Sequence, residues 1–304
     1  MSKNKLTRRQ FVTTVTAGAG TVLIGNTVLA ARPSATMPLS DTLKIVSLGN
    51  SGLRTTFLGM GTGYSGYDRS SGFTGSGVSG SLIRLAYDKG IRYFDCADSY
   101  GTHSGLASAL RDVSRESYTL CSKIWVGQGG IAEPERPDAN LVIDRFRSEL
   151  NTDYIDLIQI HCMTDPHWTD KEKRQMDILE KLKSKGIIRA HGVSVHSLEA
   201  LEACSGNPWV DVVHVRINPF GEAMDKSDPS LVTPVLEKLH QQGKGIIGMK
   251  ITGAGGFKNE NEKIDESLKY LTGLSSVDMV IAGFDEPDQI DRYIARVQKA
   301  LWTS

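Results

Sequence analysis

Four polar residues stand at or just after the ends of short apolar runs: Asp95 and Tyr100 in FDCADSYG, Lys123 in LCSKIW and His161 in LIQIHC. A free tyrosine holds its proton too firmly to be a good acid at neutral pH, and a lysine ammonium beside the phenol favours the phenolate and lowers that pKa. Asp95 would keep Lys123 charged and oriented, and His161 could donate a hydrogen bond to a carbonyl oxygen. This set predicts a proton donor and an oxyanion site for reducing a C=O group, with the hydride supplied by a cofactor.

Such residues meet only if the fold brings their strand ends together. From residue 43 onward, short apolar runs alternate with longer amphipathic stretches. The expected strands are residues 56–59, 91–95, 117–123, 154–161, 187–194, 210–215, 245–249 and 277–282. The expected helices are residues 79–89, 140–150, 172–185, 198–204, 230–242, 261–271 and 287–297. This alternation over about 260 residues predicts an α/β fold, a (β/α)₈ TIM barrel, whose active site lies where the strands end.

Two features precede the first helix of this barrel. Residues 43–48 and 53–58 flank the turn-forming sequence GNSG, which predicts a β-hairpin that caps the N-terminal end of the barrel. The sequence GTGYSG at residues 61–66 fits the glycine fingerprint of a dinucleotide-binding turn. In a Rossmann unit the last glycine already lies inside the helix, whereas here a polar loop continues to residue 78. We therefore interpret these glycines as a strand-end loop of the barrel.

The chain resembles an aldo-keto reductase from about Leu43 to its C-terminal region, most specifically in GIRYFDCADSYGTHSGLASAL, residues 90–110. The resemblance implies one barrel over residues 43–304 that has an N-terminal hairpin and binds NADP(H) or NAD(H) without a Rossmann motif. It implies that Asp95, Tyr100, Lys123 and His161 form the catalytic tetrad, with Tyr100 as the general acid. The implied reaction is the reduction of an aldehyde or ketone, a small-molecule carbonyl substrate, or the oxidation of the alcohol.

The resemblance also implies a cofactor-binding surface. The positions concerned are Gly61, Thr62, Asp95, Ser194, His214, Met249, Lys250, Gly253, Gly255 and Gly283. Three departures from the family pattern lie on this surface. Val195 replaces an asparagine after Ser194, His214 stands where the family has a glutamine, and Met249 stands where it has an aromatic residue.

The choice between NADP and NAD stays open. The resemblance favours NADP, but VIAGFDEPDQIDRY, around the last strand end, has Arg292 as its only cation, so paired charge for a 2′-phosphate has little support. The loops that would line the substrate pocket contain aromatic residues and one further histidine, either as pocket walls or as loop anchors. These residues are Tyr64, Tyr67, Trp125, His167 and Trp168.

The N-terminus differs from the rest of the chain. TRRQFV at residues 7–12 holds a twin arginine, and residues 12–30 carry no charge and end in Val28, Leu29 and Ala30. Residues 1–30 resemble a bacterial twin-arginine (Tat) export signal, and residues 31–42 form a linker. We expect the Tat export machinery as a partner, an exported or periplasmic protein, and no stable membrane insertion after cleavage. An uncleaved membrane anchor is the alternative.

Charge and cysteine content limit other possibilities. Lysine plus arginine and aspartate plus glutamate both number 35, so the formal charge is zero and no nucleic-acid partner is expected. Cys96, Cys121, Cys162 and Cys204 show no CxxC spacing. Although export would place them in an oxidising compartment, three of them stand within or beside apolar runs, which favours buried free thiols over a disulfide.

Two other functions remain as alternatives. A barrel that binds the nucleotide with little or no turnover agrees with export away from the NADPH supply and with the departures at the cofactor surface. A metal-dependent hydrolase would use Asp95, His161, His191, His196 and His214. Such sites usually carry two histidines after the first strand, and GMGTG supplies none, so no metal is expected.

Overall fold

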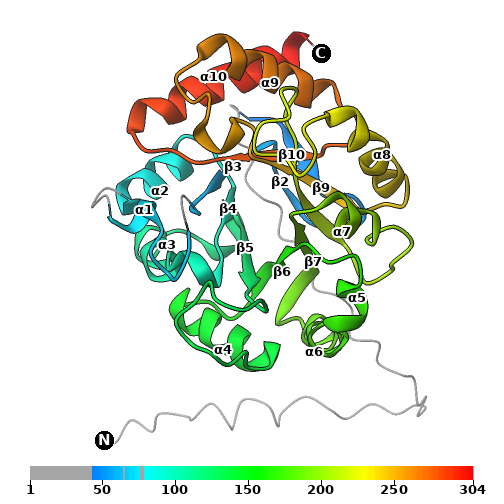
Figure 1. Ribbon diagram of the computed structural model, residues 1–304. Helices are drawn as coiled ribbons and strands as arrows, with labels where there is room; N and C mark the ends of the chain where they lie inside the picture. Colours follow the sequence, from blue (N-terminus) through cyan, green and yellow to red (C-terminus); the bar gives the residue numbers. More distant parts are fainter. Residues whose placement is uncertain (1–42, 64–65, 76–78, 304) are drawn as a thin grey trace, which may run out of the picture. The chain divides into compact units, whose positions relative to one another are not determined.

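The computed structural model describes residues 43–63, 66–75 and 79–303 (Figure 1). The expected export signal, residues 1–30, and linker, residues 31–42, lie outside the described residues, as does Tyr64. Within the described part of the chain, no helix is both long and apolar enough to cross a membrane.

Eight parallel strands close into a barrel in the order β10-β3-β4-β5-β6-β7-β8-β9. Their bounds are β3 (Leu58–Gly61), β4 (Tyr93–Asp95), β5 (Thr119–Ile124), β6 (Ile155–Met163), β7 (Ile188–Val195), β8 (Val212–Arg216), β9 (Gly245–Met249) and β10 (Met279–Ala282). Figure 1 looks along this barrel, with the strands at the centre and the helices around them. Each predicted strand overlaps one strand of the barrel, so the predicted (β/α)₈ barrel is confirmed.

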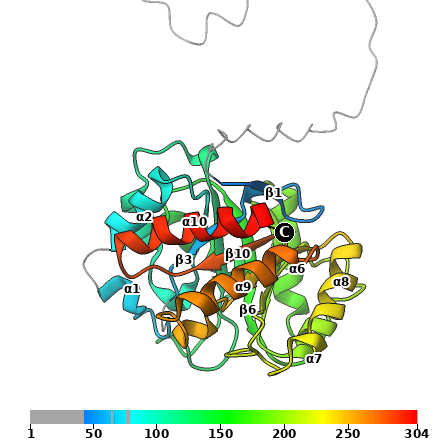
Figure 2. The ribbon, with the colours of Figure 1, turned by 90° about the horizontal axis from the view of Figure 1, so that it is seen from above.

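Helices cover the outside of the barrel. Those that overlap the predicted helices are α2 (Ser79–Asp88), α4 (Ala139–Glu149), α6 (Lys173–Ser184), α7 (Leu198–Glu202), α8 (Thr233–Gln241), α9 (Asn261–Gly273) and α10 (Pro287–Thr303). The short helix η3 (Pro229–Leu231) also falls at the start of the predicted helix 230–242. Other short segments are additional to the prediction: α1 (Gly72–Gly75), α3 (His103–Ala109), α5 (Trp168–Lys171), η1 (Asp98–Tyr100), η2 (Arg115–Ser117) and η4 (Gly253–Gly255). Helix α10 packs against α9 and α2, which closes the ring of helices where β10 pairs with β3 (Figure 2).

The N-terminal hairpin consists of β1 (Ile45–Ser47) and β2 (Arg54–Thr56), which pair antiparallel. Leu48 and Leu53 from its turn are buried against inward-facing side chains at the start of the barrel strands. This apolar floor is made by Tyr93, Cys121, Leu157, Ala190, Val212, Ile247 and Met279. The hairpin therefore caps the N-terminal end of the barrel, as predicted. Because Thr56 pairs with Ile45 in the hairpin, the first barrel strand begins at Leu58 and not at residue 56.

A polar layer lies directly above the apolar floor. Alternate side chains of a strand face the same side, so a residue two positions after a floor residue also faces the barrel interior. The members of this layer are Asp95, Lys123, Gln159 and His214, and all four are buried. The sequence thus stacks ionisable groups on a sealed apolar base, at the level where the barrel opens toward its C-terminal end.

Candidate active site

Lys123 and Asp95 form an ion pair inside the barrel. Lys123 Nζ donates to both carboxylate oxygens of Asp95 at 2.6 Å and to the carbonyl oxygen of Cys96 at 2.9 Å. Both side chains are at most 3% exposed, and burial disfavours each charge. Burial is the largest single effect on each group, but the combined opposing interactions outweigh it, with the partner of the ion pair first among them, so the pKa of Asp95 is held well below its usual range and the pKa of Lys123 well above it. Both groups therefore stay charged at neutral pH.

Tyr100 and His161 lie next to this pair. Tyr100 ends η1, just after β4, and its phenol oxygen lies 3.4 Å from His161 Nε2. Lys123 Nζ lies 5.1 Å from the centre of the Tyr100 ring. His161 is buried in β6, and its ring meets the rings of Tyr100 and Trp125 edge-on. The structure thus brings together all four residues that the sequence predicts as catalytic.

The acidity of Tyr100 differs from the prediction. Burial raises the pKa of Tyr100 to about 12, and the opposing effect of the Lys123 charge is smaller. The Asp95 carboxylate, bound to the same ammonium, adds to the rise. The expectation that Lys123 brings this pKa below that of a free tyrosine is therefore wrong in its net direction, although the lysine does limit the rise.

His161 is neutral in this environment. Burial lowers the pKa of His161 well below its usual value, and the positive charge of Lys123 lowers it further. A neutral imidazole carries one N–H, and a proton on Nε2 makes that nitrogen a donor toward the space beside Tyr100. His161 can therefore donate a hydrogen bond to a substrate oxygen, as predicted.

The glycine-rich loop after β3 makes room for the Tyr100 ring. A Cβ atom at Gly63 would lie 2.4 Å from Cε2 and Cζ of Tyr100, and one at Gly66 would lie 2.3 Å from Cδ1. Only residues without a side chain allow the backbone to lie this close to the phenol. Thr62 holds the same loop, because its hydroxyl donates to the carbonyl oxygen of Asp95 at 2.8 Å. The fingerprint-like glycines therefore make room for the Tyr100 ring.

His214 lies beside the ion pair in the polar layer. Its Nε2 is 3.3 Å from Asp95 Oδ1 and 3.4 Å from the phenol oxygen of Tyr93. Burial lowers the pKa of His214, so the ring is neutral. A proton on Nε2 would serve the Asp95 carboxylate, which can only accept a hydrogen bond, and would leave Nδ1 as an acceptor.

Several buried polar atoms in this region have no hydrogen-bond partner within the described residues: Nδ1 of His161, Nδ1 of His214 and Oε1 of Gln159. Buried polar atoms are rarely left unpaired, so these atoms indicate a polar ligand. A carboxamide group, which nicotinamide carries, offers the N–H donor that an acceptor such as His214 Nδ1 lacks. This donor and acceptor set fits the nicotinamide end of a cofactor.

Other predicted cofactor residues stand at the C-terminal ends of neighbouring strands. Gly283, after β10, lies next to Gly61, because a Cβ at Gly283 would be 3.7 Å from the Gly61 carbonyl oxygen. Ser194 is buried in β7, and its Oγ accepts the backbone N–H of Cys162 at 2.9 Å. Its hydroxyl hydrogen and its second lone pair are still available to a ligand.

Another segment of the chain occupies part of the space beside the loop after β9. Met249 is buried at the end of the strand, and Lys250 follows with a left-handed φ of 60°. Gly253 and Gly255 also have positive φ values, 60° and 94°. A Cβ at Gly253 would lie 2.8 Å from the carboxyl carbon of Glu222, so this carboxylate lies against the glycine loop. A pyrophosphate bound there would meet Glu222.

The expected pocket residues separate into two groups. Trp125 lies beside His161, with ring centres 5.2 Å apart, and can form a wall of the site. Trp168 is 1% exposed, and its Nε1 donates to the carbonyl oxygen of Ala200, so it is a structural anchor. Tyr67 is 60% exposed and His167 is also exposed.

The five residues of the metal-hydrolase alternative do not converge. His191 stacks on Trp209 with ring centres 4.3 Å apart and pairs with Glu180 on α6 at 3.0 Å, outside the barrel interior. Within the described part of the chain, one group brings three possible ligand atoms within 4.8 Å of one another: Asp95, Cys121 and His214. The Lys123 ammonium already occupies both oxygens of this carboxylate, which disfavours a second cation there.

Two further interior residues were not predicted. Gln159 faces the polar layer, and Arg216 ends β8, where it pairs with Asp225 at 3.0 Å and lies 2.5 Å from His196 Nδ1. Both stand two positions after an inward-facing residue of their strands, so strict alternation along β6 and β8 would have identified them.

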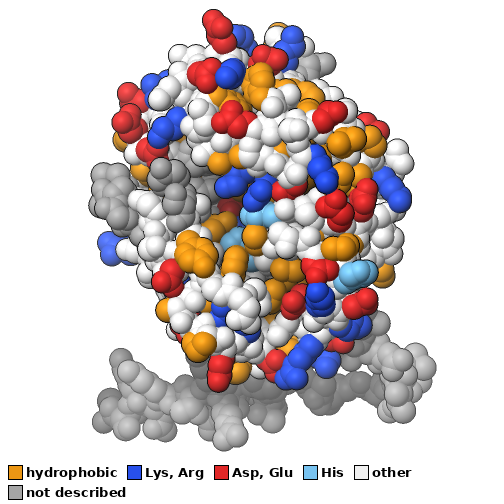
Figure 3. Space-filling view, in the orientation of Figure 1, with side chains coloured by type: hydrophobic (Ala, Val, Ile, Leu, Met, Phe, Trp, Pro, Cys, Tyr) orange, Lys and Arg blue, Asp and Glu red, His pale blue; other side chains and the backbone are white. Residues whose placement is uncertain are grey.

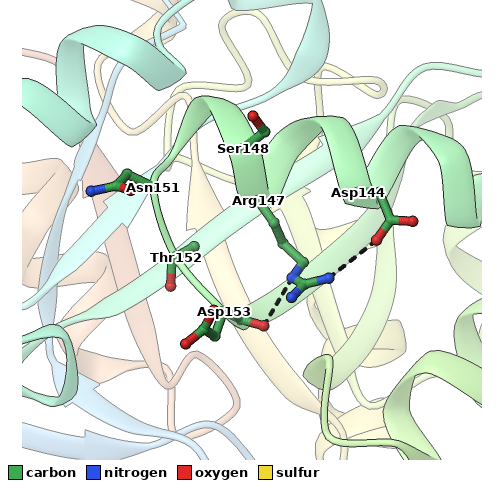
Figure 4. Close-up of a pocket in the computed structure, with 6 residues that line it drawn as sticks. All are labelled: Asp144, Arg147, Ser148, Asn151, Thr152 and Asp153. Carbon is green, nitrogen blue, oxygen red and sulfur yellow. Dashed lines mark hydrogen bonds and ion pairs between the residues drawn. The ribbon is translucent and has the colours of Figure 1, made fainter.

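The space-filling view shows histidine side chains in a hollow at the centre of the face that Figure 1 presents (Figure 3). A separate polar pocket of about 570 Å³ lies at the end of α4 and along the turn that leads toward β6 (Figure 4). There Arg147 binds Asp144 and the carbonyl oxygen of Asp153. This turn is at the N-terminal end of β6, whereas His161 stands near the C-terminal end of that strand. The pocket is therefore not part of the tetrad site.

Known proteins place the chain in one family. Residues 58–270, which include the whole tetrad, match the Aldo/keto reductase family. The aldo-keto reductase YhdN of Bacillus subtilis is 27% identical over 256 residues, which cover 78% of this chain and 75% of that protein. Glyoxal reductase of the same bacterium is 33% identical over 127 residues, 39% of this chain and 42% of that protein.

Solved structures agree with this match. A putative aldo-keto reductase from Pseudomonas aeruginosa superposes with a TM-score of 0.68 at 25% identity, covering 84% of this chain and 95% of that chain. An aldo/keto reductase from Klebsiella pneumoniae, solved with NADP and acetate, shares the fold with a TM-score of 0.64 at 17% identity, covering 84% and 90%. From the family match, the barrel and the assembled tetrad, the protein belongs to the aldo/keto reductase family.

Proposed function

We propose that the protein reduces an aldehyde or ketone, or oxidises the alcohol, with Tyr100 as the group that gives or takes the proton. Membership of the family makes the protein an NAD(P)H-dependent oxidoreductase. The observation that carries the assignment of Tyr100 is its position 3.4 Å from His161 Nε2 and above the Lys123 ammonium.

A bound nicotinamide supplies the hydride, and the residues of the chain hold the substrate oxygen and move the proton. A carbonyl oxygen beside Tyr100 and His161 accepts a hydrogen bond from each, which orients the carbonyl and stabilises negative charge on its oxygen. The phenol proton then passes to this oxygen, and the Lys123 ammonium stabilises the phenolate that remains. With a pKa of about 12, Tyr100 is fully protonated at neutral pH, and an alkoxide is basic enough to take its proton.

For the cofactor, we propose the strand-end surface of Gly61, Thr62, Ser194, His214, Met249 and Gly283, with the nicotinamide end at the unpaired nitrogen of His214. Lys250, Gly253 and Gly255 are proposed for the phosphates, which requires Glu222 to move aside. The Klebsiella relative contains NADP, which supports a nicotinamide cofactor for this fold. NADP and NAD are both compatible with these residues.

The test is Tyr100→Phe, which removes the proton donor and keeps the ring. We expect kcat to fall by about 10²–10⁴-fold, the range for loss of a general acid, and the cofactor Kd to stay the same. The matched control is Tyr87→Phe, because Tyr87 on α2 binds Ser117 at 2.8 Å, away from the site. Undiminished turnover in the Tyr100 variant would defeat the proposed mechanism. Tight cofactor binding by the wild type without turnover of any carbonyl would instead support the nucleotide-binding alternative.

We also propose that residues 1–30 direct export through the Tat machinery to the periplasm, followed by cleavage. The support is the twin arginine, Arg8 and Arg9, before an uncharged segment that ends in small residues. The test compares the wild type with Arg8→Lys, Arg9→Lys in fractions of a bacterial host that has the machinery. We expect the wild type in the periplasm and the variant in the cytoplasm, and the same compartment for both would contradict the proposal.

A further inference from the structure

We propose that the substrate carries a carboxylate in addition to its carbonyl group, and that His196 and Arg216 bind this carboxylate beside the tetrad. We call these two residues the carboxylate site. The proposal rests on the proposed function, because it names the substrate class of the same active site. Neither residue belongs to the tetrad or to the predicted cofactor surface.

His196 and Arg216 stand at neighbouring strand ends. His196 directly follows β7, and its backbone N–H donates to the carbonyl oxygen of Met163 at the end of β6 at 2.7 Å. Arg216 ends β8, which pairs with β7. Both side chains are half-buried. Figure 3 shows lysine or arginine side chains directly beside the histidines in the central hollow. The carboxylate site therefore lies at the open, C-terminal end of the barrel, where a substrate must enter.

A bulge in β6 connects the carboxylate site to the tetrad. The register between β6 and β7 shifts, so that His161 and Cys162 together stand opposite Ser194. An extra residue in one strand breaks the alternation of side chains and re-aims them. As a result, His161 contacts Tyr100, whereas Cys162 Sγ lies 2.9 Å from His196 Nδ1. Consecutive residues of one strand thus contact the tetrad and the carboxylate site.

The contact with Arg216 determines which nitrogen of His196 carries the proton. Arg216 Nη2 lies 2.5 Å from His196 Nδ1, and a guanidinium can only donate a hydrogen bond. Burial, and then the positive charges of Arg216 and Lys250, lower the pKa of His196 to about 3, so the ring is neutral. Nδ1 is then the acceptor, and Nε2 carries the single proton. Among the described residues this N–H has no hydrogen-bond acceptor, so it can donate to a ligand.

Positive charge around the carboxylate site is not fully compensated. Arg216 pairs with Asp225 at 3.0 Å, and Lys123 pairs with Asp95. The half-buried Lys250 ammonium makes no ion pair in the part of the chain that the structure describes. Burial, and then the charges of Arg216 and Lys123, lower the pKa of Lys250, so these cations lie close enough to repel one another. An anionic ligand at this place would relieve the repulsion.

Arg216 keeps donors for such a ligand. Each Nη atom of a guanidinium carries two N–H groups, and the contacts with Asp225 and His196 use one of each. Arg216 Nε is buried and also has no partner within the described residues. Buried donors are rarely left unpaired, so this nitrogen indicates a missing acceptor. A carboxylate can accept from the guanidinium and from His196 Nε2–H at the same time.

A substrate bound in this way is held at two points. Its carbonyl oxygen lies beside Tyr100 and His161, and its carboxylate lies beside His196 and Arg216, which orients the carbonyl for reaction. Because Lys250 is also proposed for the cofactor phosphates, we assign the direct carboxylate contacts to the other two residues. An uncharged aldehyde of the same size lacks the second point of attachment.

Binding without turnover tests the carboxylate site directly. Calorimetry with and without the nicotinamide nucleotide compares benzoate with benzamide and acetate with acetamide, because each amide has nearly the shape of its acid but no charge. We expect at least one acid to bind the wild type about 10–100-fold more tightly than its amide, the range for a hydrogen bond to a charged group. Arg216→Gln should lose this preference, and the control Arg84→Gln, at an exposed ion pair with Asp88, should keep it. Acids that bind the wild type no more tightly than their amides overturn the proposal.

The phosphates of the cofactor are the other possible source of an anion. If His196 and Arg216 bound a phosphate, saturating nucleotide would displace the carboxylate, and Arg216→Gln would weaken nucleotide binding. Either result overturns the proposal. We expect the carboxylate to bind in the presence of the nucleotide, and the nucleotide Kd to be the same in Arg216→Gln and the wild type.

Steady-state kinetics extends the test to the reaction. The substrates are the carboxybenzaldehyde isomers and the corresponding formylbenzamides. We expect the ratio of kcat/KM for the best acid to that for its amide to fall at least about tenfold in Arg216→Gln and in His196→Phe, mainly through a higher KM for the acid. Unchanged ratios in both variants overturn the proposal.

A measurement on the unmutated protein covers the case in which the variants do not fold. Nitrogen-15 NMR of the histidine side chains should show His196 with a protonated Nε2 and a bare Nδ1, and benzoate or acetate should shift the Nε2 signal. A proton on Nδ1 in the free protein, or no shift with either acid, would overturn the proposal. The binding and NMR readouts use neither Tyr100 nor turnover, so failure of the Tyr100→Phe test and failure of the present proposal are distinguishable.

Discussion

Gly63 provides the sharpest test of how the loop after β3 supports catalysis. A Cβ atom at this position would lie 2.4 Å from two ring atoms of Tyr100, whereas ordinary contact begins at 3.4 Å. In Gly63→Ala the phenol must therefore move by about 1 Å, a misplacement that costs on the order of 10²-fold in rate. This corresponds to about 2.7 kcal/mol in the activation free energy. Gly63 is not among the glycines with positive φ, so alanine adds no backbone strain of its own.

The assay compares kcat, KM and cofactor Kd of Gly63→Ala with those of Gly105→Ala. Gly105 lies in α3, and a Cβ there meets no atom within 4 Å, so the control should keep full activity. Its unfolding free energy should stay the same or rise by up to about 1 kcal/mol, because alanine favours a helix over glycine. We expect the Gly63 variant to lose kcat while its cofactor Kd is unchanged.

Two results would refute this reasoning. Full activity of Gly63→Ala would mean that the loop moves and the ring does not, so that the glycine does not position Tyr100. A loss of cofactor binding with unchanged kcat would mean that the loop serves the nucleotide, as the glycine fingerprint first indicates.

Three other predictions concern charge and exposure. Lys123→Met leaves the Asp95 carboxylate buried without its cation, so the unfolding free energy measured in urea should fall by about 3–5 kcal/mol at pH 7. An unchanged unfolding free energy would contradict the pairing. Burial raises the pKa of Glu149, but hydrogen bonds from His103 and Arg145 outweigh this effect and lower the pKa to about 2. Glu149 therefore stabilises the fold at pH values above its unfolded pKa of about 4.3, and this stabilisation is lost as the pH falls to about 2. The stability gap between wild type and Glu149→Gln should therefore shrink over that interval, and a constant gap would show that the pKa is not lowered. Of the four free cysteines only Cys162 is partly exposed, so a thiol reagent should label one site in the native protein, and Cys162→Ser should abolish that fast phase.

The sequence predicts the barrel and the tetrad because both depend on local patterns. Eight apolar runs separated by amphipathic stretches require only the periodicities of strand and helix, and residues at strand ends of a parallel barrel must meet. Asp95, Lys123 and His161 each follow from such an end. Three of the four cysteines are buried for the same reason, since the sequence places three of them in or beside apolar runs.

Properties that depend on packing between distant segments could not be predicted in this way. The pKa of Tyr100 depends on how far surrounding segments such as the glycine loop bury the phenol, and the effect of burial on this pKa outweighs that of the Lys123 charge. The Glu222 carboxylate lies against Gly253 although 31 residues separate them along the chain, and no local pattern connects the two. Spacing alone also cannot show that His214 reaches Asp95 from the opposite wall.

The raised pKa of Tyr100 and the buried ion pair have one physical origin. An apolar floor sealed by the hairpin keeps water from the underside of the polar layer, so each charge there depends on the others for compensation. In this environment the Lys123 ammonium interacts more favourably with Tyr100 after proton transfer than before it, because it attracts a buried phenolate far more strongly than a neutral phenol. The site therefore holds Tyr100 protonated until the substrate oxygen becomes strongly basic, and Lys123 offsets part of the free-energy cost that burial adds to the phenolate. Without this ammonium the phenol would release its proton still less readily, so we expect Lys123 to contribute most at the moment of proton transfer.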